Sequence, residues 1–177
     1  MNFLLCSVSW SSRTRNRMTC NPTKCKEIIF RKKRFSEGNA PVSNVPQCTE
    51  LSILGVTFQQ NCKYSSHVRA KVIKANKSLF VLGSLRKEGM FQEEVDHLFN
   101  AIVLPNFSYA LSVYGASDSD LSVIQNFLDR CMKRKYTSKN VNIRDLLEKA
   151  DKTLSKKRSN DPECPFFQFL PKEKKTR

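Results

Sequence analysis

The sequence is poor in glycine and in acidic side chains. Only five of its 177 residues are glycine, and 16 Asp and Glu stand against 31 Lys and Arg. The glycines form neither a phosphate-binding loop nor a Gly-x-Ser-x-Gly nucleophile elbow, which mark many nucleotide-binding proteins and hydrolases. The residues alone therefore favour no enzyme class and identify no catalytic residue.

Clustered carboxylates, which a two-metal polymerase or nuclease needs for Mg²⁺, are also missing. Glu93 and Glu94 lie about 100° apart on an expected helix whose apolar face is needed for packing. Asp118 and Asp120 stand where another helix should begin. In both places the helix dipole favours negative charge, so these four residues have a structural explanation. We expect no metal ligand and no cofactor.

Histidine is limited to His67 and His97, and the seven cysteines have no framework spacing. Cys20 and Cys25 are too far apart in sequence for a zinc knuckle. An odd number of thiols without a secretory signal is typical of a reducing compartment. We therefore expect an intracellular protein, cytoplasmic or nuclear, in which the two histidines are ordinary surface or core residues.

No segment is long and apolar enough for a bilayer helix. Residues 98–117 carry no charge, but seven of these twenty residues are Asn, Pro, Ser or Gly, and Pro105 interrupts the middle. Two buried helices joined at the proline fit this pattern better. The first ten residues are apolar but lack the basic region of a secretory signal. We expect no membrane partner.

The net charge of +15 is unevenly distributed. Residues 1–35 hold nine Lys and Arg against one carboxylate, residues 36–129 hold seven against nine, and residues 130–177 hold fifteen against six. A near-neutral middle thus lies between two basic ends. Such ends favour a polyanionic partner, with nucleic acid as the first candidate and an anionic membrane as the second. A merely solubilising surface is the alternative.

Two short segments near the start are β-prone. Residues 27–30 form one, and residues 51–58, rich in Ile, Val, Thr and Phe, predict the clearest strand. Within that strand, Gly55 indicates a bulge or a close backbone approach. The basic Arg31-Lys-Lys-Arg34 run separates the two and could serve as a nuclear import signal.

From Tyr64 the apolar period becomes helical, and the sequence predicts four or five helices. In the first, Lys71, Lys74 and Lys77 form a cationic row beside the apolar stripe, and Arg69 lies on the opposite flank. The apolar positions of the successive helices are Val68, Val72, Ala75, Leu79 and Leu82; Phe91, Val95, Leu98, Phe99, Ile102 and Val103; Leu121, Ile124, Phe127, Leu128 and Cys131; and Ile143, Leu146, Leu147, Ala150 and Leu154.

Helix boundaries are also readable. Pro105 limits the second helix, an apolar segment over residues 107–114 follows, and Ser117 and Asn142 can cap the last two helices. Residues 156–177 read as a basic tail. The expected fold class is α+β, predominantly helical, with a short β-hairpin followed by a helical bundle.

Several short motifs follow one another along residues 8–171. They are Val8-Ser-Trp10-Ser; Asn21-Pro-Thr-Lys24-Cys-Lys-Glu-Ile-Ile-Phe30; Leu51-Ser-Ile-Leu54-Gly55-Val56; His67-Val68; Leu104-Pro105-Asn106-Phe-Ser-Tyr109-Ala110; Ile124-Gln125; Leu146-Leu147-Glu148-Lys149-Ala150-Asp151; and Asp161-Pro162 with Phe169-Leu170-Pro171. In this order they resemble the C-terminal part of reverse transcriptases from non-LTR (LINE-type) retrotransposons.

The resemblance implies the end of a polymerase palm over residues 1–62, a helical thumb-like domain over 63–136, and a C-terminal helix with a basic tail over 137–177. The family's catalytic (Tyr/Phe)-x-Asp-Asp hairpin is missing from this sequence. The full-length enzyme would need Mg²⁺. We therefore expect a truncated fragment of an RNA-directed DNA polymerase from a mobile element, not an enzyme as it stands.

The resemblance also implies a binding site. Lys24 would lie in the palm near the incoming nucleotide, Gly55 in the primer grip, and the lysine row would face the template–primer duplex. The expected nucleic-acid-binding residues are Lys24, Gly55, Arg69, Lys71, Lys74 and Lys77. The plain alternatives are that Lys24 is a solvated turn lysine, that Gly55 forms a strand bulge, and that the lysine row is a solvated helix face.

Such a fragment should bind RNA and DNA weakly and without sequence preference, through phosphates. The alternative is a non-catalytic nucleic-acid-binding or interaction module derived from such an element. The sequence leaves the oligomeric state open.

Overall fold

The structure is a computed structural model that describes residues 21, 24–30 and 45–161. The chain forms two compact units, residues 1–70 and 71–177, and each is described by itself. The division falls inside the long helix α2 (Ser65–Lys87). The expectations for residues 1–20, the basic run at 31–34 and residues 162–177 of the expected tail lie outside the described part. The tail was predicted to begin at residue 156, which is wrong, because the last helix continues to Ser159.

The first unit contains a β-hairpin. Strands β1 (Glu50–Ile53) and β2 (Val56–Gln59) pair antiparallel, with Ile53 opposite Val56. Leu54 and Gly55 form the two-residue turn, with φ of 48° and 79°, as a type I′ turn requires. The single strand expected over residues 51–58 is therefore wrong, since Gly55 lies in a turn and not in a bulge. Apolar residues run through the turn, which concealed it from sequence analysis.

The β-prone segment at residues 27–30 makes a single parallel bridge, between Glu27 and Gln47. The backbone N–H of Glu27 donates to the carbonyl of Pro46 (3.0 Å), and its carbonyl accepts from the N–H of Cys48 (2.8 Å). The following Ile28 and Ile29 are buried. Within the described residues this segment is thus held by burial, by one parallel bridge and by a hydrogen bond from the Gln47 side chain to the Glu27 carboxylate.

Helix α2 begins against the hairpin. The buried His67 accepts a hydrogen bond at Nδ1 from the backbone N–H of Thr57 (3.2 Å). This nitrogen must be unprotonated to accept, so the neutral ring carries its proton on Nε2. Further along α2, Val68, Ala75 and Leu82 of the expected apolar stripe are buried, whereas Val72 and Leu79 are half-buried.

The second unit continues with α3 (Gln92–Leu98), the π-helical turn η2 (Phe99–Val103), α4 (Pro105–Ser108) and α5 (Leu111–Tyr114). Pro105 has no N–H and interrupts the regular hydrogen-bond ladder. The side-chain amide of Asn106 compensates by donating to the carbonyls of Ile102 (2.7 Å) and Val103 (3.2 Å). The expected break at Pro105 is confirmed, as a change of helix type.

Two residues of the predicted second apolar stripe point to solvent. Phe91 is 77% exposed and Ile102 is 41% exposed. Phe91 precedes α3, and its backbone N–H donates to the Glu94 carboxylate (3.1 Å). Phe91 thus acts at the helix start through its backbone, whereas the widening at η2 turns Ile102 away from the core. Placing either residue in the core was wrong.

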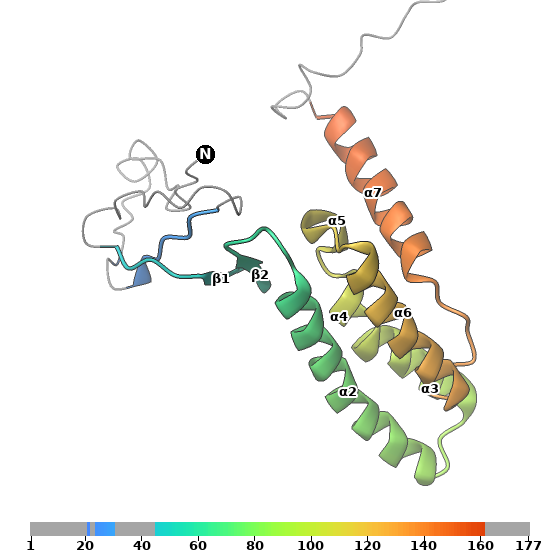
Figure 1. Cartoon of the computed structure of the whole chain (residues 1–177). Helices are drawn as coiled ribbons and strands as arrows, with labels where there is room; N and C mark the ends of the chain where they lie inside the picture. Colours follow the sequence, from blue (N-terminus) through green and yellow to red (C-terminus); the bar gives the residue numbers. More distant parts are fainter. Residues whose placement is uncertain (1–20, 22–23, 31–44, 162–177) are drawn as a thin grey trace, which may run out of the picture. The chain divides into compact units, whose positions relative to one another are not determined.

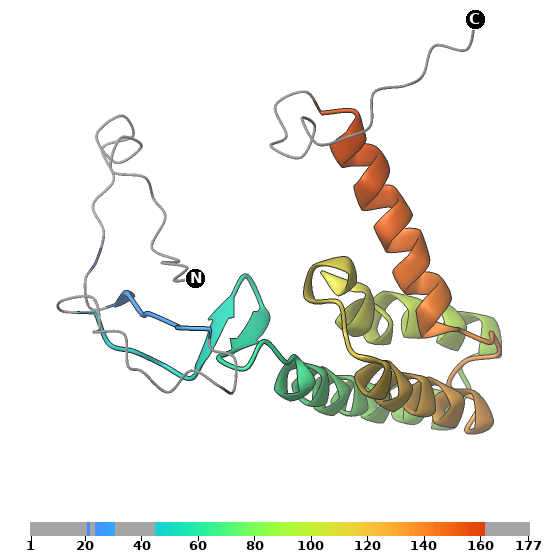
Figure 2. The same cartoon turned by 45° about the horizontal axis from the view of Figure 1, so that its top comes forward.

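Helix α6 (Asp118–Lys133) begins where it was expected to begin and has the expected apolar face. The Ser117 hydroxyl accepts a hydrogen bond from the N–H of Asp120 (3.3 Å), so the predicted cap is confirmed. All five residues predicted for its apolar stripe are buried, and the ring of Phe127 lies 5.3 Å from that of Phe107 in α4. In Figures 1 and 2, α2 runs beside α6.

Helix α7 (Ile143–Ser159) is capped by the Asn142 side chain, as predicted. Gln125 of α6 holds the start of α7, because its side chain donates to the Val141 carbonyl (3.2 Å) and accepts from the Ile143 N–H (3.0 Å). Residues 151–158 are all exposed, and Leu154, expected to face inward, is 36% exposed. The second half of α7 extends beyond the rest of its unit (Figures 1 and 2).

The predominantly helical α+β class is confirmed, with a two-stranded antiparallel sheet and a helical bundle. Among the described residues, no helix combines the length and the apolarity needed to cross a bilayer.

Candidate nucleic-acid interface

Helix α2 carries six cationic side chains and no carboxylate over its 23 residues. Ala, Leu, Lys and Arg are strong helix formers, so the segment remains helical without ion pairs of its own. Arg86 and Lys87 stand in the last turn, where the helix dipole favours positive charge. The remaining cations have no such role at a helix end.

The three lysines of the predicted row are not equivalent. Lys74 and Lys77 are exposed, whereas Lys71 is half-buried, with its Nζ 5.5 Å from the ring centroid of Tyr109. Burial, and secondly the positive charge of Lys74, lower the pKa of Lys71. Lys71 is thus held against the bundle through a cation–π contact, which leaves Lys74 and Lys77 as the outward-projecting pair.

Large apolar side chains occur beside these lysines. Phe80 is 78% exposed, Ile73 58% and Val81 50%. Ile73, Lys77 and Phe80 follow i, i+4, i+7 spacing, which places them along one side of α2. This apolar side was not predicted, because the predicted stripe of α2 includes only the residues that face the core. The available signal was a second set of apolar residues on the same helix.

The other three predicted residues lie in the first unit. Lys24 is exposed in a short helical turn, with its N–H donating to the Asn21 carbonyl (3.1 Å). Gly55 is exposed in the hairpin turn, and Arg69 is exposed on α2. All three are accessible to a ligand.

A second cationic group lies where α2 and α6 end together. The Arg86 guanidinium donates to the Arg134 carbonyl (2.7 Å) and lies over the Tyr136 ring, with 5.7 Å from its central carbon to the ring centroid. Gly83 makes room for this ring, since a Cβ there would lie 3.3 Å from the Tyr136 hydroxyl. The exposed cations at this end are Lys87, Lys133, Arg134 and Lys135.

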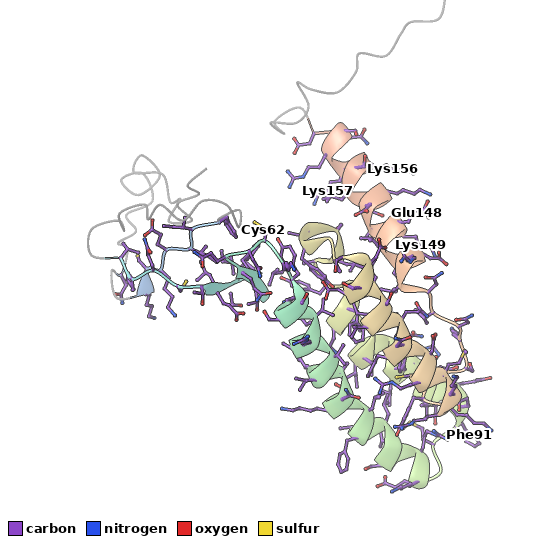
Figure 3. All side chains as sticks on the ribbon, in the orientation of Figure 1. Cys62, Phe91, Glu148, Lys149, Lys156 and Lys157 are labelled. Carbon is purple, nitrogen blue, oxygen red and sulfur yellow. The ribbon has the colours of Figure 1, made fainter. Side chains whose placement is uncertain are left out.

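Helix α7 presents a third cationic surface. Lys149, Lys156 and Lys157 are exposed, and Figure 3 shows the last two on the half that projects from the bundle. Lys152 differs, because its Nζ lies 2.5 Å from Glu148 Oε1. The hydrogen bond from Lys152, together with its charge, lowers the pKa of Glu148. Lys152 thus forms an ion pair within its own helix.

No group of three or more His, Cys, Asp or Glu side chains that could hold a metal occurs within residues 21, 24–30 and 45–161. A cavity of about 420 Å³ lies between α6 and the start of α7. Its lining includes Ser122, Gln125, Asp129 and Arg144 and contains neither His nor Cys.

Comparison of the chain with protein-family models, with curated proteins and with solved structures gave no match.

Proposed function

We propose that the chain is the C-terminal, template–primer-binding part of a non-LTR retrotransposon reverse transcriptase, and that alone it binds RNA and DNA without polymerising. The single observation that carries this proposal is α2, a helix with six cations, no carboxylate and two lysines projecting outward. The order of the family-like motifs along the sequence supports the assignment to a reverse transcriptase.

Phosphate contacts explain the expected behaviour. Lys74 and Lys77 are exposed point charges, which neutralise phosphates without reading bases. Cations also gather at the joint end of α2 and α6 and on α7, so a polyanion would meet the same sign of charge on several surfaces. Binding should therefore be weak, tolerant of sequence and steeply dependent on salt.

Salt-dependent binding tests this proposal. Fluorescence anisotropy would follow the full chain binding to a labelled RNA–DNA hybrid between 50 and 200 mM salt. Each lost phosphate contact on a duplex removes about 0.9 from the log–log slope. The double variant Lys74→Gln/Lys77→Gln should reduce the slope by about 1.8. Lys152→Gln, at the lysine that Glu148 already pairs, is the matched control and should change the slope little.

Two results would overturn the proposal. One is the absence of any nucleic-acid binding at 50 mM salt. The other is template-directed primer extension by the purified chain with Mg²⁺. That activity needs carboxylates that bind Mg²⁺, and the proposal assigns no such residues to this chain.

A non-catalytic interaction module, derived from such an element, is the second candidate. The exposed Ile73, Phe80 and Val81 favour it, because apolar side chains on one helix are typical of protein contacts. This candidate predicts that any binding of the chain to nucleic acid changes little with salt concentration. The salt series therefore separates the two functions directly.

A further inference from the structure

We propose that Phe80 is a stacking platform for an unpaired base, with Lys77 and Lys74 binding the phosphates of the same strand. The inference rests on the proposed function and refines its ligand. On this basis α2 contacts single-stranded nucleic acid, or the single-stranded arm of a junction, in preference to a closed duplex.

The position of Phe80 is the first argument. Its ring is 78% exposed, while Phe99, Phe107 and Phe127 of the same unit are buried almost completely. The bundle therefore completes its aromatic core without Phe80. Lys77 is one turn before Phe80 on the same helix, so the ammonium group and the ring reach the same stretch of surface.

The alternation of chemistry along α2 is the second argument. Ile73, Lys77 and Phe80 put an apolar group, a cation and an aromatic ring in succession along one side, with Lys74 beside them. A single strand of nucleic acid likewise alternates charged phosphates with flat bases. Basic grooves with interleaved aromatic side chains bind such strands because every base has a face that can stack.

An anionic membrane fits this side less well. Helices that lie in a bilayer interface separate a continuous apolar face from a polar one. Here Lys77 stands between Ile73 and Phe80, so inserting both apolar side chains would bury the Lys77 stem and require its ammonium group to snorkel back to the headgroups. An acidic protein surface would satisfy the lysines but supplies no regular partner for the ring.

A duplex is also a poorer partner for Phe80. Its bases are stacked on one another and only their edges face the grooves, so a ring can reach a base face only at an end or an unpaired site. Lysine contacts alone do not distinguish single strands from duplexes. The predicted preference for single strands therefore depends on Phe80.

The experiment compares two equally exposed phenylalanines. Anisotropy would measure binding of the full chain to a labelled 12-mer of dT and to a closed DNA hairpin of similar charge. Phe80→Ala should weaken binding of dT by about 5- to 150-fold, which corresponds to about 1–3 kcal/mol per stacked base. Phe91→Ala is the matched control, because Phe91 is 77% exposed before α3 (Figure 3), and should change binding less than twofold.

Replacing Phe80 by another aromatic residue gives a direct readout of base stacking. Phe80→Trp, combined with Trp10→Phe to remove the only native tryptophan, should keep the affinity for dT. Its fluorescence should be quenched when a base stacks on the indole. Circular dichroism of each variant would verify that the helix content is unchanged.

The outcomes are separable. If Phe80→Ala and Phe91→Ala behave alike while Lys74→Gln/Lys77→Gln weakens binding, the stacking inference is wrong and the proposed function stands. If no nucleic acid binds at all, the proposed function itself fails. Binding to phosphatidylserine vesicles that Phe80→Ala abolishes, with dT binding unchanged, would identify a membrane occupant and overturn the inference.

Discussion

Asp96 of α3 accepts hydrogen bonds from both the backbone N–H (2.7 Å) and the hydroxyl of Ser138, 42 residues further along the chain. Gln92 adds a third bond to the same carboxylate (3.1 Å). Asp96 is buried, and Ser138 lies in the loop between α6 and α7. This carboxylate therefore connects two segments that no local pattern relates.

Replacing either partner should destabilise the second unit. Asp96→Asn keeps the shape but loses the charge, and we expect it to cost about 1.5–3 kcal/mol, the range for hydrogen bonds to charged groups. Ser138→Ala should cost about 1 kcal/mol, since the backbone bond remains. Urea unfolding would measure both. Ser122→Ala, which removes an exposed bond to the Asp118 carbonyl (2.8 Å), is the control and should be nearly neutral.

The same pair predicts a pH dependence. Burial of Asp96 by itself raises its pKa, but the hydrogen bonds from Ser138, Gln92 and Thr137 outweigh it and leave the pKa below its ordinary value. Above its unfolded pKa of about 3.9, the ionised carboxylate thus makes its full contribution to the free energy of unfolding. This contribution is lost as the pH falls through the folded pKa.

The test is a difference between two proteins. The stability advantage of the native chain over Asp96→Asn should be constant between pH 5 and pH 7 and should shrink below about pH 4. Other carboxylates, Glu148 among them, cancel in this comparison. A stability advantage that grows as the pH falls would contradict the lowered pKa of Asp96.

The hairpin turn contains a strained residue. Leu54 has a φ of 48° and is 85% exposed, and a non-glycine residue in this left-handed region costs about 1–2 kcal/mol. Leu54→Asn should stabilise the hairpin by about 1 kcal/mol, because Asn tolerates this conformation. Amide hydrogen exchange of β1 and β2 would report it. Gly55→Ala, at a φ of 79°, should have the opposite effect.

The thiols should differ sharply in reactivity. Cys131 is buried in α6, and burial raises its pKa to about 11 although Arg130 and Arg134 act in the opposite direction. Cys62 is exposed. Alkylation of the native chain at pH 8, followed by peptide mass spectrometry, should label Cys62 rapidly and Cys131 only after denaturant is added. Equal labelling without denaturant would show that α6 is not packed as described.

Sequence reasoning succeeded where the signal is local. Ser117 and Asn142 cap their helices through side chains two or three residues from the groups they bind. It failed at Gly55, because a type I′ turn with leucine in its first position lacks the usual turn residues. The prediction for Phe91 was also wrong. Periodicity shows that a residue belongs to an apolar stripe, but it does not show whether neighbouring elements cover that end of the stripe.

Local patterns were sufficient to predict the class of the fold, the helix starts at Ser117 and Asn142, and the concentration of positive charge on α2. These properties depend on periodicity, capping and composition, which act over a few residues. No local pattern predicts that Asp96 binds Ser138, that Lys71 lies over Tyr109, or that Phe80 faces solvent. Such outcomes depend on which surfaces meet, and segments distant in the sequence decide that together.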